Sequence, residues 1–250
     1  MTRSQQDRTG RKSWLILPAA CLAALAMAGL QAWSEAAPPP AKPLDPALRD
    51  VIDRFDAMQA KIERISANFK EVKNLALLKD PLVQGGRFYH TKPDKFLWEY
   101  TLPEPKMRIL NGKSTITYFP AQKRAEEIKT RFSKRLVKYL GLGPTLEDLG
   151  DEFEMSLVKE NDYKGTDLVL LIPNRRQIEK RITEIRLWLD SDVSYPRRIR
   201  ILEVDGDTTV ITFDNLAINP EISLTKYEIT FPKDVQVTRE FSGFFSESSR

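Results

Sequence analysis

Cysteine and histidine are almost missing from this chain of 250 residues, which has one of each. Cys21 lies in an apolar N-terminal run, so a chain cleaved after that run has no disulfide and no thiol chemistry. His90 has no second histidine to complete a metal site, and a catalytic base needs a positioned partner. Carboxylates are plentiful, but they fall in expected turns and helix starts, away from any apolar pocket. We therefore expect no enzyme, no metal site and no cofactor.

Two signatures of phosphate and nucleic-acid binding are also missing. The sequence has no glycine-rich phosphate loop and no basic stripe with interleaved stacking aromatics. The formal net charge is +4, so positive and negative side chains nearly balance. The sequence therefore gives no support for a nucleotide site of the P-loop type, and we expect no nucleic-acid partner.

The N-terminus has the pattern of an export signal. Basic residues precede an almost wholly apolar stretch from Trp14 to Leu30, and small residues follow around Ala36. This order is typical of a secretory signal peptide, although a membrane anchor is the alternative for such a run. We expect a signal peptide at residues 1–36, a proline-rich tether at 37–44, one domain at 45–240 and a polar tail at 241–250.

Two segments have the spacing of amphipathic helices. Asp45 and Pro46 are a typical helix start, and apolar residues then recur every three or four positions as far as Ile65. A second helical pattern runs over Arg131–Leu140 and ends at glycine and proline residues. A further helical turn is expected at Thr145–Leu149, with the Thr145 hydroxyl as its cap.

The rest of the domain has the period of two that is typical of strands. Turn residues such as Asn111-Gly112 separate short apolar runs. Many closely spaced strands with tight turns indicate one antiparallel sheet, curled or closed. Strands are expected from Ala67, at four places between Leu82 and Tyr118, and at Arg124–Lys129, Phe153–Lys159, Thr166–Ile172, Ile182–Asp190, Arg197–Val204, Thr208–Leu216 and Tyr227–Phe231.

One of these strands has an aromatic face. Phe96, Trp98 and Tyr100 alternate with Leu97 and Glu99, so the three rings lie on one side of the sheet. That side must be covered either by protein, as in an ordinary core, or by a ligand. From composition alone a filled core is the simpler interpretation, because aromatic residues dominate ordinary cores.

The aromatic strand belongs to a longer pattern. The order G-x-x-x-x-x-K-P-x-x-F-x-W-x-Y is followed by a proline, a glycine and Y-x-P. The positions are Gly86, Lys92, Pro93, Phe96, Trp98, Tyr100, Pro103, Gly112, Tyr118 and Pro120. With the later Asn219-Pro220 pair and the segment Tyr227–Lys233, this ordered set resembles the bacterial outer-membrane lipoprotein carrier (LolA) family. The resemblance covers roughly residues 45–239.

The resemblance implies a mainly β fold, with a single curled antiparallel sheet that forms an incomplete β-barrel and amphipathic helices that cover it as a lid. It implies a periplasmic carrier that binds the acyl chains of lipoproteins, or a related envelope lipid, in an apolar cavity. The implied partners are this cargo, an inner-membrane lipoprotein-releasing transporter and an outer-membrane acceptor.

The expected site residues fall into three groups. Those lining the lipid cavity are Phe88, Phe96, Trp98, Tyr100, Ile116, Tyr118, Leu168 and Leu170. Those on the lid helices are Phe55, Met58, Ile62, Phe132 and Leu136, and those at the lid clasp or a partner contact are Lys92 and Pro93. Lys92 stands where well-known family members have an arginine that hydrogen-bonds the lid. Lysine lacks the planar five-donor fork, so a clasp built on it is weaker, and a solvated turn lysine is the alternative.

Two other classes of function remain open. A periplasmic sensor or regulatory module of the same fold would bind a lipid or lipoprotein and signal to a membrane partner. A purely structural domain would have a hollow filled by its own side chains. Replacing Trp98 with glutamate distinguishes these cases: a cavity-lining position keeps its fold and loses lipid uptake, whereas a core position unfolds.

Overall fold

The computed structural model describes residues 44–112, 114–128 and 145–239. These residues all belong to one compact unit, Pro43–Arg250. Four predicted segments lie outside the described residues. They are the signal peptide at 1–36, nearly all of the tether, the helix at Arg131–Leu140 with Phe132 and Leu136, and the tail at 241–250. Among the residues that are described, no helix is long and apolar enough to cross a membrane.

Twelve strands form one sheet, in the order β12-β6-β5-β4-β3-β2-β1-β11-β10-β9-β8-β7. All neighbouring pairs are antiparallel except β12 and β6. The strands are β1 (Arg64–Asn74), β2 (Leu82–Thr91), β3 (Lys95–Leu102), β4 (Lys106–Asn111), β5 (Thr115–Phe119), β6 (Arg124–Ile128), β7 (Phe153–Val158), β8 (Thr166–Pro173), β9 (Ile182–Asp190), β10 (Pro196–Glu203), β11 (Thr208–Ile218) and β12 (Gln236–Thr238).

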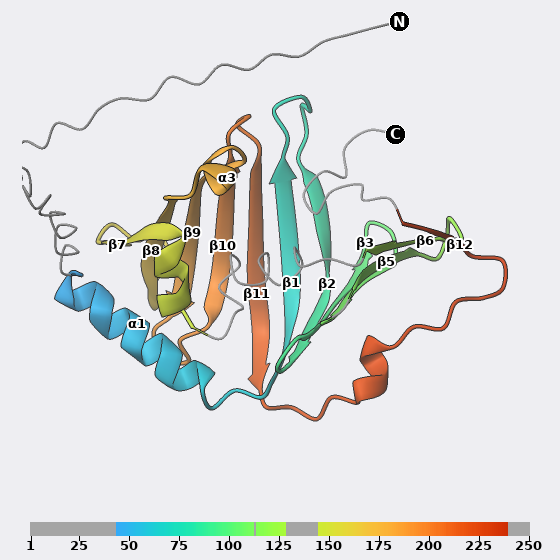
Figure 1. Cartoon of the computed structure of the whole chain (residues 1–250), viewed down its shortest axis with the longest axis horizontal. Coiled ribbons are helices and arrows are strands. Elements are labelled where there is room, and N and C mark those ends of the chain that lie inside the picture. The colour runs from blue at the N-terminus through green and yellow to red at the C-terminus, as the bar shows by residue number, and fades with distance from the viewer. Residues whose placement is uncertain (1–43, 113, 129–144, 240–250) are drawn as a thin grey trace, which may run out of the picture. The chain divides into compact units, whose positions relative to one another are not determined.

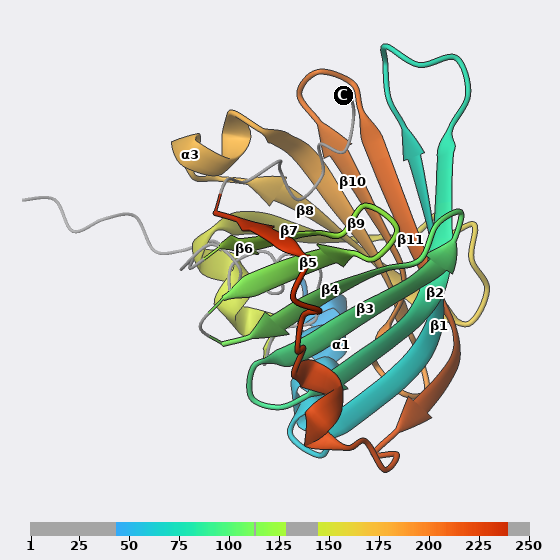
Figure 2. The same ribbon diagram turned by 90° about the vertical axis from the view of Figure 1, so that its right-hand side faces the viewer.

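The sheet is curled but open (Figure 1). Its end strands, β12 and β7, are not neighbours, so the sheet does not close into a barrel. In Figure 2 the strands β3–β6 cross in front of β7–β10, so the two halves of the sheet face each other across its inner side. The predicted mainly β fold with a single curled sheet is therefore confirmed.

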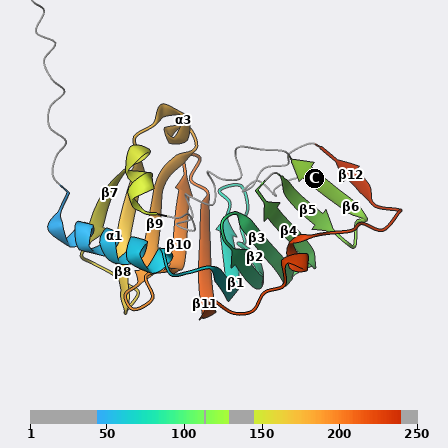
Figure 3. The ribbon, with the colours of Figure 1, turned by 60° about the horizontal axis from the view of Figure 1, so that its bottom comes forward.

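The helix predicted near the start of the domain is α1 (Pro46–Gln59). Its start is as predicted: Pro46 occupies the first turn, and the Asp45 side chain accepts a hydrogen bond from the Ala47 N–H at 2.9 Å. Figure 3 shows α1 lying along the side of β7–β10 and leading into β1. Among the described residues the other helical segments are the 3₁₀ turns η2 (Glu147–Asp151) and η3 (Leu224–Tyr227) and the short α3 (Arg176–Glu179).

The prediction that this helix continues to Ile65 is wrong. The helix ends at Gln59, Ile62 lies in the following turn, and Ile65 is in β1. The cause is a long-range contact: Asn219, just after β11, accepts hydrogen bonds from the N–H groups of Glu63 and Arg64 at 2.7 and 3.0 Å. These bonds hold Glu63 and Arg64 beside the end of β11. The chain therefore leaves the helix after Gln59, although apolar residues continue at helical spacing in the sequence.

The strand predicted at Tyr227–Phe231 is also wrong. Ser223 accepts a hydrogen bond from the Thr225 N–H and opens η3 instead. The chain then runs without a strand to β12, which sequence patterns did not reveal. Tyr227 packs in a buried cluster with Tyr89, Leu97, Ile109 and Ile222 on the outer face of β2–β4. This C-terminal segment covers an apolar outer surface that would otherwise be exposed.

Candidate functional site

The predicted aromatic residues share the inner face of the sheet. In the antiparallel pairing Trp98 lies opposite Phe88, and Phe96 and Tyr100 occupy the same face of β3. All four side chains are at most 5% exposed. They belong to one buried cluster that extends from β3 through β1 and β11 to β8 and includes α1.

The rings pack against one another as in a core. Phe69 on β1 meets Trp98 and Tyr100 edge-on, with centroids 4.9 and 5.0 Å apart. Phe88 lies 4.6 Å from Trp98 and 5.3 Å from Phe213 on β11. Protein therefore covers the aromatic face in this conformation, and an acyl chain would reach it only by displacing what lies on it.

Four predicted cavity residues lie on the opposite face of the sheet. Directly paired residues of antiparallel strands point the same way. Tyr118 pairs with Met107, and Leu168 pairs with Trp188, on the outer face. Ile116 and Leu170 share that parity, so the expectation for all four is corrected. The inner positions of these strands are held by Thr115, Thr117, Val169 and Leu171.

The predicted lid residues on α1 face the cluster. Phe55 is 1% exposed and Met58 packs partly buried against the same residues. Ile62 is fully buried, although it follows the helix. The apolar stripe of α1 is completed by Leu48, Val51 and Ile52. One side of α1 thus packs on the core, which is what a lid helix requires.

Polar contacts hold α1 along its length. Arg54 donates to Asp167 on β8 at 2.9 Å, and Arg49 donates to Glu147 in η2 at 3.3 Å. Asp56 accepts a hydrogen bond from the Leu146 N–H at 2.8 Å. Burial raises the pKa of the Asp56 carboxyl, although its backbone hydrogen bonds oppose that shift. These contacts hold α1, from Arg49 to Asp56, near β8 and the segment that contains η2.

Lys92 fixes the other end of the helix. It lies in the β2–β3 turn, with Pro93 after it, and its Nζ donates to the main-chain oxygen of Gln59, the last residue of α1. Its backbone N–H donates to Glu63 at 2.9 Å. A cation at a helix C-terminus also interacts favourably with the negative end of the helix dipole. Lys92 thus links the β2–β3 turn to the end of α1, and this contact is named the Lys92 clasp.

Replacing Lys92 with alanine is expected to loosen α1. The substitution removes a charged donor from the helix end, so we expect a loss of about 1 kcal/mol in the free energy of unfolding and faster hydrogen exchange of the last α1 amides. Lys92→Arg should keep exchange slow, and Lys61→Ala, at an exposed neighbouring position, serves as the control. Unchanged exchange in Lys92→Ala would mean that Lys92 is an ordinary turn lysine.

A polar strip that the sequence did not reveal borders the aromatic face. The Tyr100 hydroxyl donates to Glu71 at 3.2 Å, and Lys73 lies 3.5 Å from the same carboxylate. Lys106 donates to Gln84 at 3.0 Å and lies 4.2 Å above the Tyr100 ring. Glu71 and Lys73 lie two and four positions after Phe69 in β1, so they point to the same inner face. This alternation was the sequence signal that could have revealed the polar strip. The inner face is therefore amphipathic, with charge paired beside the rings.

His90 lies on the inner face at the end of β2. It is 3% exposed, and its ring stacks on Phe96 with centroids 4.1 Å apart. Burial, with a smaller contribution from the charge of Lys92, lowers the pKa of His90 from 6.5 to about 4. Within the described ranges no group of three or more His, Cys, Asp or Glu is placed to hold a metal ion. His90 is thus a neutral, buried ring at neutral pH.

This histidine predicts a pH dependence of stability. Between pH 6.5 and about 4, His90 is protonated in the unfolded chain but stays neutral in the folded protein. The free energy of unfolding should therefore fall as the pH falls through this range. The loss should approach about 3 kcal/mol at the acidic end. Urea unfolding of wild type and His90→Phe across this range measures it. Parallel curves for the two proteins would contradict the assignment.

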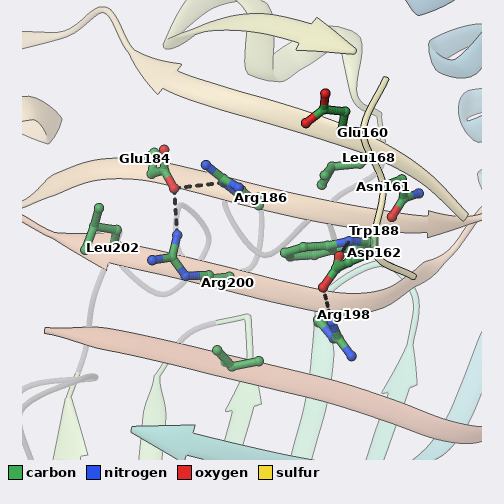
Figure 4. Close-up of a pocket in the computed structure, with 11 residues that line it drawn as sticks. Glu160, Asn161, Asp162, Leu168, Glu184, Arg186, Trp188, Arg198, Arg200 and Leu202 are labelled. Carbon is green, nitrogen blue, oxygen red and sulfur yellow. Dashed lines mark hydrogen bonds and ion pairs between the residues drawn. The ribbon is translucent and has the colours of Figure 1, made fainter. Parts of the chain in front are cut away.

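A groove on the outer face of β8–β11 is the second candidate (Figure 4). Arg186 and Arg200 both donate to Glu184, at 2.9 and 2.7 Å. Further along, Asp162 accepts from the Trp188 indole at 3.0 Å and from Arg198 at 3.4 Å. Leu168 lines this groove rather than the inner face. Its arginines are paired with carboxylates, so the groove is a poor match for acyl chains.

Comparison with known proteins agrees with this architecture. A family model described as outer membrane lipoprotein carrier protein LolA matches residues 60–230. An outer-membrane lipoprotein carrier protein of Bordetella avium is 22% identical over 192 residues, which are 75% of this chain and 86% of that protein. One of Cupriavidus taiwanensis is 24% identical over 231 residues, which are 90% and 98%.

A solved structure shows the same fold. An uncharacterized conserved protein from Thermus thermophilus superimposes with a TM-score of 0.51 at 12% identity. The match covers 78% of this chain and 99% of that one. At this identity the likeness concerns the fold alone.

Proposed function

The chain belongs to the outer-membrane lipoprotein carrier (LolA) family, and on this basis we propose that it is a periplasmic carrier of acylated molecules. Its cargo is the acyl chains of a lipoprotein, or of a related envelope lipid, moved from the inner to the outer membrane. The partners we propose are an inner-membrane lipoprotein-releasing transporter and an outer-membrane acceptor. The protein acts by binding and release, without catalysis of its own.

The observation that carries this proposal is the aromatic inner face with α1 packed beside it. Phe88, Trp98 and Phe213 form a continuous apolar surface, and α1 packs on the same cluster with Phe55 and Met58. An exposed acyl chain is unfavourable in water by about 0.8 kcal/mol per methylene. A surface of this kind offsets that cost once the lid has moved aside.

The contacts of α1 favour motion of the helix as a unit. Polar contacts lie near both of its ends, Arg49 with Glu147 at the start and Lys92 with Gln59 at the end, and the chain between Gln59 and β1 is a short turn. An exposed ion pair such as Arg49 with Glu147 contributes little, about 0–1 kcal/mol. We propose that α1 swings about the turn after Gln59, and that acyl chains take the place of its apolar stripe against the rings.

Native mass spectrometry of the protein purified gently from its periplasm tests the proposal. We expect a mass excess that fragments to acyl chains or to a lipidated peptide. In a Trp188→Phe variant, Trp98 is the only tryptophan after residue 36, so lipid entry should also change its emission. A clean apo mass after incubation with lipoprotein-bearing membranes and their releasing transporter, with unchanged Trp98 emission, would contradict carriage.

A further inference from the structure

The end of α1 meets the end of β2 at a corner that contains two buried polar side chains without partners. Gln59 is 2% exposed and His90 is 3% exposed. Within the described part of the chain, neither the Gln59 amide nitrogen nor either ring nitrogen of His90 has a hydrogen-bond partner. Buried polar groups are nearly always paired, and an unpaired one is destabilising, so this corner requires an explanation.

Three contacts bring the chain segments that contain these groups to one corner of the fold. Lys92 Nζ donates to the Gln59 main-chain oxygen, and the Lys92 N–H donates to Glu63 just after the helix. His90 lies two positions before Lys92 and pairs with Ile65 at the start of β1. Gln59 and His90 therefore belong to the two chain segments that meet at the Lys92 clasp, where α1 joins the sheet.

The corner borders the aromatic face. The His90 ring stacks flat on Phe96, with an angle of 9° between the ring planes. Phe96 in turn lies 6.4 Å from Phe88, which touches Trp98 and Phe213. A continuous path of rings thus leads from the polar corner into the middle of the apolar cluster.

The donors and acceptors among the unpaired atoms indicate which chemical group they would bind. The Gln59 amide nitrogen has two N–H donors, and a neutral His90 ring has one N–H donor and one acceptor nitrogen. This set is rich in neutral donors, which suits a carbonyl oxygen. We propose that the Gln59–His90 corner is the subsite for the carbonyl groups that join acyl chains to the rest of the cargo, with the chains extending over the rings toward Trp98.

This subsite rests on the proposed carrier function and sharpens it. It assigns an orientation to the cargo, with its ester or amide linkage at the clasp and its methyl ends toward the middle of the sheet. The shared chemistry is an acyl carbonyl, and both a lipidated N-terminal cysteine and a phospholipid contain one.

The test compares two lipids that differ only in this carbonyl. Dioleoyl phosphatidylethanolamine has two ester carbonyls, and its dialkyl ether analogue has none. Binding from mixed micelles, quantified by native mass spectrometry, should favour the ester lipid about tenfold in wild type, as expected for one hydrogen bond of ordinary strength. Gln59→Leu and His90→Phe should each bind both lipids with nearly equal affinity. Their melting temperatures should match or exceed that of wild type at pH 7, because each substitution removes an unpaired buried group.

Tyr195→Phe is the matched control. Its hydroxyl is also buried without a partner among the described residues, but its ring packs edge-on against Phe213, and it belongs to the turn before β10 rather than to the segments of the clasp. This variant should keep the preference for the ester lipid. An equal loss in Tyr195→Phe, no preference in wild type, or a preference that survives both corner substitutions would overturn the subsite.

Two further arms separate the possible sources and the possible failures. A synthetic triacylated cysteinyl peptide is measured beside the phospholipid, and tighter binding of one of them identifies the source of the carbonyl in the same subsite. If wild type binds the peptide and both lipids without any ester preference, the subsite fails and the carrier function stands. If wild type binds none of the three, the carrier function itself is contradicted.

Discussion

Replacing Trp98 with glutamate is expected to unfold the protein. Trp98 is 5% exposed and touches the rings of Phe69, Phe88 and Phe213. Truncating a buried tryptophan costs about 3–5 kcal/mol, and an unpaired buried carboxylate costs several kcal/mol more. Together these losses are comparable to the whole stability of an ordinary domain, about 5–15 kcal/mol. Circular dichroism and urea unfolding of the purified variant measure the effect.

The control for this substitution places the same charge on the surface. Leu77 is 97% exposed in the loop between β1 and β2, so Leu77→Glu should change the free energy of unfolding by less than about 0.5 kcal/mol. A folded Trp98→Glu protein that has lost lipid uptake would instead mean that Trp98 lines an open cavity, as the aromatic pattern in the sequence allowed. The packing of the rings favours unfolding, which would show that Trp98 belongs to the packed core of this conformation. An unfolded variant reports nothing on lipid uptake, so native mass spectrometry of the wild-type protein decides between carriage and a purely structural domain.

Gly86→Ala is expected to have the second largest effect. A Cβ at this position would lie 1.9 Å from the main-chain oxygen of Glu99 and 2.9 Å from the Tyr100 Cα. Both atoms belong to the backbone of β3, which pairs with β2 at this point. The strands must separate to admit the methyl group, and we expect a loss of at least about 3 kcal/mol in the free energy of unfolding. The displaced Tyr100 should also weaken its contact with Glu71.

A second glycine provides the comparison. At Gly150 in η2 the nearest atom to an added Cβ is the Met155 methyl carbon, at an ordinary 3.6 Å. Gly150→Ala should therefore be nearly neutral, within about 0.5 kcal/mol. Chemical unfolding of the two variants gives the difference directly. A Gly86→Ala protein as stable as Gly150→Ala would show that β2 and β3 are farther apart than described.

Sequence patterns predicted the structure correctly where residues close in the sequence determine the conformation. Asp45-Pro46 correctly predicted the start of α1, and the Asn111-Gly112 pair correctly predicted a turn between two strands. Gly112 has a φ of +79°, which glycine adopts without steric cost. The alternation of Phe96, Trp98 and Tyr100 also placed the three rings correctly on one face. In each case the signal and its structural cause lie within a few residues.

The errors arose where the two faces of a strand are equally apolar. In β8, Leu168 and Leu170 alternate with Val169 and Leu171, so the sequence does not say which pair points inward. The outer Leu168 is buried beside Trp188, whose indole donates to Asp162 in the loop before β8, whereas the outer Leu170 is only half-buried. The parity of this strand is thus a property of the whole sheet and its coverings.

The Lys92 clasp and the Gln59–His90 corner could not be predicted from the sequence for another reason. Lys92 and Gln59 are far apart in the sequence, and neither has a local pattern that indicates the other. Their contact exists because β2 returns beside the end of α1. The resemblance to family members with an arginine at this position suggested a role for Lys92, and the geometry supplied its partner.

The middle of the sheet has a consequence for how this chain folds. β1, near the start of the domain, pairs along its whole length with β11, near the end, whereas β2–β6 and β7–β10 each form by hairpins between successive strands. Closing a long loop is entropically costly, so the β1–β11 pair should form late. Until β11 is complete, the chain consists of two half-sheets with open edges, and such edges pair readily with other chains. A newly made chain therefore needs protection from aggregation until its last long strand has emerged.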